Sequence, residues 1–513
     1  MSHKSTGTYN IGNIFKVAAI RYQNQEALFC ATTSRRYSYI ELNDRVNCLG
    51  NGLIRLGLKK GDRAAFLCTN RSEIVEIFGA LAKIGVIGIP LNYRLAAEEV
   101  IELVDHCEAN AFIFDPWFGE TAERVHKKLP GVKLLVGMGD SIPDIALDYE
   151  KIIEESSPRE PTVEISEEDI QYFNLTSGTT GHPKVYTLTH YNNATGLMVM
   201  ATHHDLTRDD VILTAFPIFG RVGFGWCMAG LMTGARIVIH QFNVGEILKL
   251  IESESVTISN WVPTMASFVL MSDDVDSHDL SSLRALVFAA APLTSELRKE
   301  IKERLCPNIY EYYGLQESAI LVSIGPKEKE RKPDSVGKPV FGADVRIVDA
   351  DGNDVAVGEV GEIIGRAPSA TSGYYKNEEK NKQCFKNGWF HTEDLGRFDK
   401  EGFLYLSGRV KDMIISGGQN VFAVEVEEII MAHPAVAECA VVGLPDKTWG
   451  EAVTAIVVRK AGASVTEEEL TDFVKQKIAG FKTPKRIIWQ EEVLPRTPTG
   501  KVTKFTLVEK YTT

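Results

Sequence analysis

Hydrophobic and polar positions follow a helix-then-strand pattern along most of the first 290 residues. Residues 41–56 space their apolar positions as an amphipathic helix does, and a Gly-Leu-Lys-Lys-Gly-Asp turn and a short apolar strand follow. The same order returns at 74–92 and 102–115. Short strands that alternate with helices predict mainly parallel sheets covered by helices. A second series of such strands lies at 211–219, 235–240, 256–263 and 285–293.

The pattern changes in the last third of the chain. Short alternating strands with Gly-Asp, Asp-Gly and Asn-Gly turns between residues 335 and 406 predict β-hairpins. After residues 408–412 we expect a compact α+β unit with helices at 424–432 and 467–477 and strands at 438–446, 452–459 and 486–490. The predicted fold is therefore α/β. A large N-terminal domain (1–408) has mainly parallel sheets covered by helices plus a β-rich subdomain, and a hinge joins it to a small α+β C-terminal domain (409–513).

Composition narrows the class of protein. A chain of 513 residues is too long for one ordinary core, so two or more domains are expected. The formal charge of −13 argues against nucleic-acid binding. Eight cysteines without a CxxC pair indicate reduced thiols in a cytoplasmic protein, and no run of 18 apolar residues predicts an integral membrane span. The first 25 residues contain no Asp or Glu, which leaves organellar targeting open.

The stretch "TSGTTGHPK" combines hydroxyls, glycines and one lysine. It is not a P-loop of the form GxxxxGK[ST], because Val185 follows the lysine. Hydroxyl groups can donate hydrogen bonds to an anion, and glycines allow the backbone to approach the anion closely. The alternative interpretation is an ordinary surface loop. The candidate residues for the anion are Thr176, Ser177, Gly178, Thr179, Thr180, Gly181 and Lys184.

Six ordered motifs carry a resemblance to a known family. They are "TSGTTGHPK" (176–184), "AAAPL" (289–293), "EYYGLQES" (311–318), "GKPVFG" (337–342), "GWFHTEDLGRFDKEGFLYLSGRVKDMI" (388–414) and "PRTPTGKVTK" (495–504). In order and spacing they resemble the adenylate-forming superfamily of acyl- and aryl-CoA ligases, luciferases and adenylation domains. The resemblance spans residues 10–505. It implies that a carboxylate and ATP form an acyl-adenylate and pyrophosphate, after which a thiol displaces AMP.

The resemblance also implies roles for individual residues. Lys501 corresponds to the lysine that bridges the carboxylate and the α-phosphate, and Glu317 and Thr180 to the Mg²⁺ ligands. Asp394 and Arg409 correspond to the ribose- and phosphate-binding pair, and Lys411 to the hinge. Further nucleotide contacts are implied for Ala290, Ala291, Glu311, Tyr312, Tyr313, Gly314, Gln316 and Asn420.

Two further sets concern the other substrates. The predicted CoA-binding residues are Gly417, Gly418, Trp449, Lys482 and Lys485. The glycine backbone could contact the pantetheine arm, the tryptophan ring could stack on the adenine, and the lysines could bind the phosphates. The alternative is a core tryptophan and ordinary surface lysines. The acyl pocket is expected to draw on Phe219, Gly220, Gly223, Trp261, Phe288 and Leu315, although aromatic core residues have the same pattern. No acid in this set would meet an α-amino group, which disfavours amino acid substrates.

Four positions depart from the family pattern. Gly220 stands where most members have a histidine that helps to position the carboxylate. Val185 replaces a glycine of the loop, an alanine of "FAAAPL" replaces another glycine, and Gln316 replaces Thr or Ser. We expect an ATP-, Mg²⁺- and CoA-dependent carboxylate–CoA ligase for a fatty, alicyclic or aromatic acid. An adenylating enzyme with a non-CoA acceptor and a non-catalytic nucleotide-binding relative remain the alternatives. The acid is not identified, and a homodimer is left open.

Overall fold

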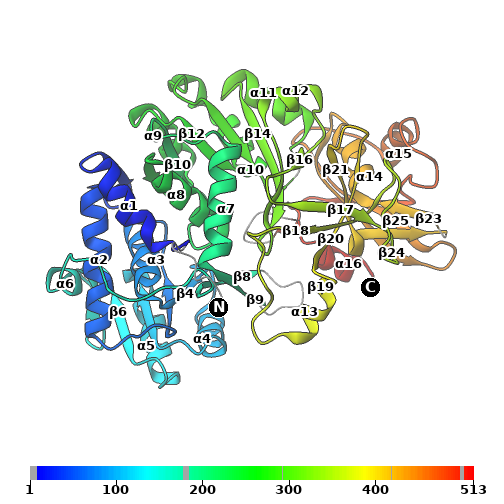
Figure 1. Ribbon diagram of the computed structural model, residues 1–513. Coiled ribbons are helices and arrows are strands. Elements are labelled where there is room, and N and C mark those ends of the chain that lie inside the picture. The colour runs from blue at the N-terminus through cyan, green and yellow to red at the C-terminus, as the bar shows by residue number, and fades with distance from the viewer. Residues whose placement is uncertain (1–8, 177–183, 292, 418, 497–501, 513) are drawn as a thin grey trace. The chain divides into compact units, whose positions relative to one another are not determined.

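The computed structural model describes residues 9–176, 184–291, 293–417, 419–496 and 502–512 (Figure 1). The chain divides into two compact units. The first runs to Pro333 and also contains Pro339–Asp344 and Arg366–Gly388. The second contains Asp334–Lys338, Val345–Gly365 and the chain from Trp389 onward. The expected domain boundary at 408/409 falls within the second unit and stays a prediction.

Two extended sheets form the framework of the first unit (Figure 1). Within each sheet the internal neighbours are parallel, and the β8/β9, β14/β15 and β1/β2 pairs are antiparallel. In spatial order one sheet contains β7 (Leu147–Asp148), β6 (Leu134–Gly137), β5 (Ala111–Phe114), β3 (Arg63–Leu67), β4 (Ile87–Leu91), β8 (Ile170–Thr176) and β9 (Lys184–Thr189). The other contains β15 (Ala319–Ile324), β14 (Ile309–Leu315), β13 (Ala285–Phe288), β12 (Ile258–Trp261), β10 (Val211–Thr214), β11 (Arg236–Ile239), β1 (Glu26–Cys30) and β2 (Arg35–Ser38).

Helices connect these strands and bury their apolar faces against the sheets. Strands such as β5 and β13 are buried at every position, as expected for strands covered on both faces. The helices of the first unit are α1 (Gly12–Tyr22), α2 (Tyr39–Arg55), α3 (Ser72–Ile84), α4 (Ala97–His106), α5 (Gly119–Lys128), α6 (Tyr149–Glu154), α7 (His190–His203), α8 (Arg221–Thr233), α9 (Val244–Ser253), α10 (Pro263–Leu270), α11 (Ser295–Arg304), α12 (Pro326–Arg331) and α13 (Glu378–Cys384), with short 3₁₀ turns η1 (Pro116–Phe118) and η2 (Val275–Ser277).

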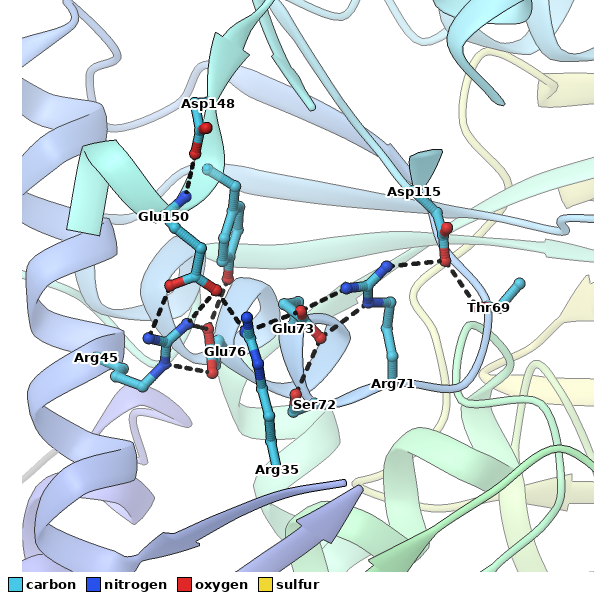
Figure 2. A network of polar contacts seen from close by, with 11 residues as sticks. Arg35, Arg45, Thr69, Arg71, Ser72, Glu73, Glu76, Asp115, Asp148 and Glu150 are labelled. Atoms are coloured by element: carbon cyan, nitrogen blue, oxygen red, sulfur yellow. Dashed lines mark hydrogen bonds and ion pairs between the residues drawn. The ribbon is translucent and has the colours of Figure 1, made fainter. Parts of the chain in front are cut away.

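Helix α3 is buried along its whole length, as expected for a helix that is apolar on nearly every face. Three charged side chains are nevertheless part of it. Glu73 and Glu76 are paired with arginines (Figure 2), and the Lys83 ammonium contacts Glu160 at 2.8 Å. The packing of α3 therefore depends on ion pairs as well as on apolar contacts.

The second unit contains two smaller sheets. Strand β20 (Trp389–Phe398) is antiparallel to both β18 (Gly361–Arg366) and β21 (Leu404–Arg409), and Asp399 and Phe403 close the β20/β21 hairpin. The other sheet has the order β23-β22-β25-β24, with β26 parallel to β25. The remaining elements are β17 (Asp344–Val348), η3 (Val410–Asp412), β22 (Met413–Ser416), β23 (Gln419–Phe422), α14 (Ala423–Met431), β24 (Val436–Asp446), β25 (Gly450–Arg459), α15 (Glu467–Lys475), β26 (Arg486–Gln490) and α16 (Lys504–Thr512). The two-residue strands β16 (Lys338–Pro339) and β19 (Phe385–Lys386) precede β17 and β20 in the chain.

Alternate residues of β24 and β25 face two different cores. Val441, Val453 and Ala455 belong to the core under α14 and α15, whereas Val442 and Ile456 belong to the core with Leu507 of α16. Helices thus cover both faces of this sheet. The α/β fold with mainly parallel sheets, the hairpins and the C-terminal α+β segment are confirmed.

Two further expectations concern the whole chain. No helix among the described residues is long and apolar enough to cross a membrane. Seven of the eight cysteines are buried. Burial raises the pKa of Cys227 to about 12, so this thiol stays protonated at neutral pH.

Candidate functional site

The glycine- and hydroxyl-rich loop connects two antiparallel strands. Thr176, the last residue of β8, pairs with Lys184, the first residue of β9. Lys184 is half-buried. The strand pairing thus fixes both ends of the loop at one end of the β8/β9 pair. The predicted anion-binding residues Ser177, Gly178, Thr179, Thr180 and Gly181 lie outside the described residues.

Two of the predicted nucleotide contacts, Ala290 and Ala291, lie just after β13. Ala289 is buried, whereas Ala290 and Ala291 are exposed. Ala290 has a φ of +70°, a left-handed conformation that costs a residue with a Cβ about 1–2 kcal/mol. A glycine would adopt this conformation freely. An alanine of this motif therefore has a strained backbone conformation, and such strain is common at functional sites.

The turn after β14 requires glycine for a steric reason. A Cβ added to Gly314 would lie 1.8 Å from the Ala319 carbonyl oxygen, and the register of β14 and β15 shifts between Tyr313 and Gly314. The Leu315 amide donates to Ser318 Oγ at 3.1 Å and closes the turn. This close approach carries Gln316 and Glu317 between the two strands.

Glu317 is a buried carboxylate whose charge no described cation neutralises. Its exposed fraction is 8%. Its Oε1 accepts a hydrogen bond from the Tyr374 hydroxyl at 2.8 Å, and no Lys or Arg in the described part of the chain forms an ion pair with it. A buried carboxylate without a cation is unfavourable unless a bound ion completes it. Glu317 therefore fits Mg²⁺, which favours one or two carboxylates together with phosphate oxygens.

Gln316 is held by residues from two distant segments. Its Oε1 accepts from the Tyr186 hydroxyl at 3.2 Å, and its carbonyl oxygen accepts from Arg221 Nη1 at 2.7 Å. Arg221, 7% exposed, also donates to the Ser369 carbonyl. The sequence analysis missed Arg221, Tyr186 and Tyr374, because no local pattern marks a side chain that contacts a turn so far away in the chain.

The preceding residues of β14 alternate between its two faces. Glu311 forms a buried ion pair with Lys329 of α12. The Tyr312 ring lies 5.8 Å from the His204 ring, and burial raises the pKa of its hydroxyl. Tyr313 is buried as well. The Glu311–Lys329 pair and the Tyr312 packing attach this strand to its surroundings, which gives these two predicted contact residues a structural function in addition.

The helix α8 begins beside the predicted acyl pocket. Gly220 is the N-cap, and a Cβ there would lie 3.5 Å from the Pro217 carbonyl oxygen, an ordinary contact distance. A Cβ at Gly223 would lie 2.3 Å from the same oxygen. The fold therefore requires glycine at 223 but not at 220. Phe219 is half-buried and packs edge-on against Tyr93, with ring centroids 5.5 Å apart.

The two large aromatic residues of the predicted pocket are packed in a core. Trp261 and Phe288 are neighbours in the β12/β13 register, and each is at most 1% exposed. Both belong to the cluster that contains Met265 and Ile301, and Trp261 Nε1 donates to Ser259 Oγ at 2.8 Å. This packing is the alternative that the sequence left open. Leu315 is half-buried, and the pocket role of all these residues stays a prediction.

The second unit brings two predicted nucleotide-binding residues together. Asp394 of β20 and Arg409 of β21 are opposite in register, and Arg409 Nε lies 2.9 Å from Asp394 Oδ1. The Asp394 amide also donates to Thr392 Oγ1 at 3.0 Å. Asp394 is 8% exposed and follows Glu393, whose φ is +60°. A strained bend thus holds a carboxylate and a guanidinium side by side, a suitable pair for sugar hydroxyls and phosphate.

Three of the predicted CoA-contacting residues also cluster. The Gly417 amide donates to the Trp449 carbonyl at 2.8 Å, and a Cβ at 417 would lie 3.0 Å from the Trp449 ring. Lys485 Nζ lies 4.9 Å from the centre of that ring, and Trp449 is 42% exposed. Lys482 instead forms an ion pair with Glu425 at 2.7 Å. Bare backbone, an exposed aromatic face and a cation therefore lie together.

Four remaining predicted residues have less structural context. Lys411 is exposed on η3. Gly418 and Lys501 lie outside the described residues, as does the side chain of Asn420. Their expected roles remain predictions.

Two family models match the chain. The model of the AMP-binding enzyme matches residues 15–375, and that of the AMP-binding enzyme C-terminal domain matches residues 425–501. The chain belongs to the AMP-binding enzyme family. This result confirms the family that the six motifs predicted.

Similar proteins agree with this assignment. A feruloyl-CoA synthase from an Amycolatopsis species is 33% identical over 91% of this chain and 92% of its own length. A long-chain-fatty-acid–CoA ligase, FadD13 of Mycobacterium tuberculosis, is 32% identical over 98% of both chains. The crystal structure of ATP-bound MatB from Rhodopseudomonas palustris superposes with a TM-score of 0.90 at 29% identity, over 98% of this chain and 99% of that one. The chain is thus an adenylate-forming enzyme of the acyl-CoA synthetase branch, an acid–thiol ligase.

Proposed function

We propose that this AMP-binding enzyme joins a carboxylic acid to CoA through an acyl-adenylate, with release of pyrophosphate and AMP. The observation that carries the proposal is Glu317, a buried carboxylate with no described cation partner, at a turn with the family's nucleotide motif. The CoA ligases among its relatives support the acceptor, since they match over nearly the whole chain.

The chemistry requires positive charge and hydrogen-bond donors around a phosphate that becomes crowded with oxygen. Magnesium, when bound with ATP, neutralises phosphate charge, and Glu317 with Thr180 would hold it. We assign the β- and γ-phosphates to the 176–184 loop. Lys501 supplies the charge between the substrate carboxylate and the α-phosphate, and Asp394 accepts hydrogen bonds from the ribose hydroxyls.

The thiol step would use the cluster at Gly417, Trp449 and Lys485. A thin pantetheine arm fits against glycine backbone, and a cation beside a half-exposed indole suits a nucleotide with phosphates. Lys482 is already paired with Glu425, so we give it a secondary role. Rotation about Lys411 would separate the two half-reactions, as in other hinged enzymes.

For the acid we propose a fatty, alicyclic or aromatic carboxylate. Phe219 and Gly220, directly before α8, are apolar, and position 220 has room for a side chain that this protein lacks. The relatives act on acids of this kind, as the names feruloyl-CoA synthase and long-chain-fatty-acid–CoA ligase indicate. None of the pocket residues is acidic, so a substrate with a free α-amino group would lack a partner.

The test is pyrophosphate release from Mg-ATP with a panel of acids from acetate to palmitate, benzoate, cinnamates and cyclohexanecarboxylate, each with and without CoA. Turnover with one class of acid that depends on CoA supports the proposal. Lys501→Ala is expected to lower the adenylation rate by about 10²–10³-fold, by analogy with the loss of one preorganised charge. Lys510→Ala, which removes an exposed lysine of α16, is the matched control and should leave the rate unchanged.

Two outcomes would contradict the proposal. Pyrophosphate release that is indifferent to CoA would indicate another acceptor. ATP binding without pyrophosphate release for any acid would indicate a nucleotide-binding relative that has lost catalysis, with Gly220 as the leading cause.

A further inference from the structure

A segment outside the nucleotide motifs holds the turn that carries Glu317. This segment, residues 369–375, follows β18 in the chain. Ser369 Oγ donates to the Ser318 carbonyl at 3.0 Å, and the Thr371 amide donates to the Glu317 carbonyl at 2.7 Å. Two consecutive carbonyls of the turn are therefore fixed by hydrogen bonds from one short piece of chain.

The same segment also holds β9, which directly follows the anion-binding loop. Thr371 Oγ1 donates to the Thr187 carbonyl at 2.6 Å, and the Thr187 amide donates to the Gly373 carbonyl at 3.2 Å. The Tyr375 amide donates to the Val185 carbonyl at 2.8 Å. Segment 369–375 thus joins the exit of the loop to the turn of the proposed metal carboxylate.

Tyr374 is the residue of this segment that reaches the carboxylate itself. It is 7% exposed, and its hydroxyl donates to Glu317 Oε1 at 2.8 Å. Its main chain is held on both sides by the Asn381 side chain of α13, with the amide donating to Oδ1 at 2.7 Å and the carbonyl accepting from Nδ2 at 3.0 Å. The phenol therefore approaches Glu317 from a fixed position.

A phenol differs from a lysine or arginine in what it does to a carboxylate. It donates a hydrogen bond to the ionised form but brings no charge, so the negative charge remains available to a cation. It also selects one orientation of a side chain that otherwise has several rotamers. We infer that Tyr374 is a positioning residue, which occupies one oxygen of Glu317 and directs the other toward the Mg²⁺ of Mg-ATP. The inference rests on the proposed function.

The test is equilibrium binding of ATP, without acid or CoA, measured by calorimetry in MgCl₂ and again in EDTA. Tyr374→Phe removes only the hydroxyl. A hydrogen bond to a charged group is worth about a 10-fold change in affinity, so Mg-ATP binding should weaken by about 10-fold while ATP binding in EDTA stays unchanged. Tyr375→Phe is the matched control, because its hydroxyl contacts Glu108 at 3.2 Å at an exposed position, and both affinities should match the wild type.

A double variant separates action through Glu317 from general damage. If Tyr374 acts only through the carboxylate, Glu317→Gln/Tyr374→Phe should bind Mg-ATP as Glu317→Gln alone does. An additional loss in the double variant would overturn the inference, as would unchanged Mg-ATP affinity in Tyr374→Phe or an equal loss in EDTA. If Tyr374→Phe does not fold, Asn381→Ala takes its place, and the same contrast between MgCl₂ and EDTA decides.

The wild-type protein distinguishes this inference from the proposed function. Wild-type affinity for ATP that is the same in MgCl₂ and EDTA would remove the metal role of Glu317, and Tyr374 would then have no metal site to position. Wild-type affinity that depends on Mg²⁺, with Tyr374→Phe equal to it, would overturn the positioning role alone.

Discussion

Among the buried carboxylates of the first unit, those of two regions have different partners. Beside α2, α3 and α6, Glu73 and Glu76 lie in a network where each of these two carboxylates contacts a guanidinium (Figure 2). Glu317 has one neutral donor, Tyr374, and no described cation. The first arrangement is complete without a ligand. The second leaves a negative charge unpaired, and this difference separates a structural cluster from a binding site.

The arginine–carboxylate contacts of the network join side chains from several elements. The Arg45 guanidinium meets Glu76 at 2.7 Å and Glu150 at 3.0 Å, and the Arg71 guanidinium meets Glu73 at 2.6 Å. Further members are Arg35, Thr69, Asp115 and Tyr149. Figure 2 shows Arg45 between Glu76 and Glu150, and Arg71 between Glu73 and Asp115. Such a cluster fixes the packing of these elements, because each charge needs its partners to stay in place.

Burial and pairing oppose each other within the network. Burial acts to raise the pKa of Glu73, but the hydrogen bonds and charge of Arg71 hold it below its usual value. Burial raises the pKa of Glu76 above its usual value despite the charge of Arg45. Pairing therefore outweighs desolvation at one carboxylate and not at the next.

The largest effect is expected when one charge of the network is removed. Arg45→Met leaves the Glu76 carboxylate, whose side chain is 0% exposed, without its cation, and this should lower the free energy of unfolding by about 3–5 kcal/mol. Arg45→Met/Glu76→Gln should recover most of the loss, since the amide carries no charge and still accepts from Tyr149. Urea denaturation followed by tryptophan fluorescence measures both.

Glu317→Gln is the matching change at the other region. It removes a buried charge that has no described cation, so stability should fall by less than about 1 kcal/mol or rise, while Mg-ATP-dependent adenylation is lost. Destabilisation equal to that of Arg45→Met would remove the contrast between the two carboxylates.

An intermediate effect is expected from acid. Because the pKa of Glu73 is lower in the folded protein, its contribution to stability is fully present above the unfolded value of 4.5 and is lost as the pH falls below it. Glu73→Gln should reduce the slope of the unfolding free energy against pH below 4.5 by at most about 1.4 kcal/mol per pH unit. An unchanged slope would show that Glu73 is not held ionised by Arg71.

The smallest effect concerns the strained alanine of the candidate site. Ala290→Gly relieves a φ of +70° but adds the larger unfolded-state entropy of glycine, so a stabilisation of about 0.5 kcal/mol is expected. Ala291→Gly, at the exposed neighbour without positive φ, should instead destabilise by about 0.5–1 kcal/mol. Thermal unfolding of both variants compares them, and equal effects would mean that Ala290 carries no strain.

Local patterns in the sequence determined the order and type of the elements. The expected helices at 424–432 and 467–477 correspond to α14 (Ala423–Met431) and α15 (Glu467–Lys475). Helical and strand periodicity are properties of neighbouring residues, so they can be read without the fold. The motifs likewise identified the family and located Glu317 as a candidate metal ligand, because motif residues are close in the chain.

Only the tertiary structure decided which of these residues meet. Tyr374 and Glu317 are 57 positions apart, and Arg221 and Gln316 are 95 apart. The structure also placed Trp261 and Phe288 in a core, and gave Ala290 its left-handed backbone. Contacts of this kind depend on strand register and on the path of connecting segments, which arise from packing of the whole unit rather than from neighbouring residues. The sequence therefore identified Glu317 as a candidate, and only the fold placed the Tyr374 hydroxyl beside it.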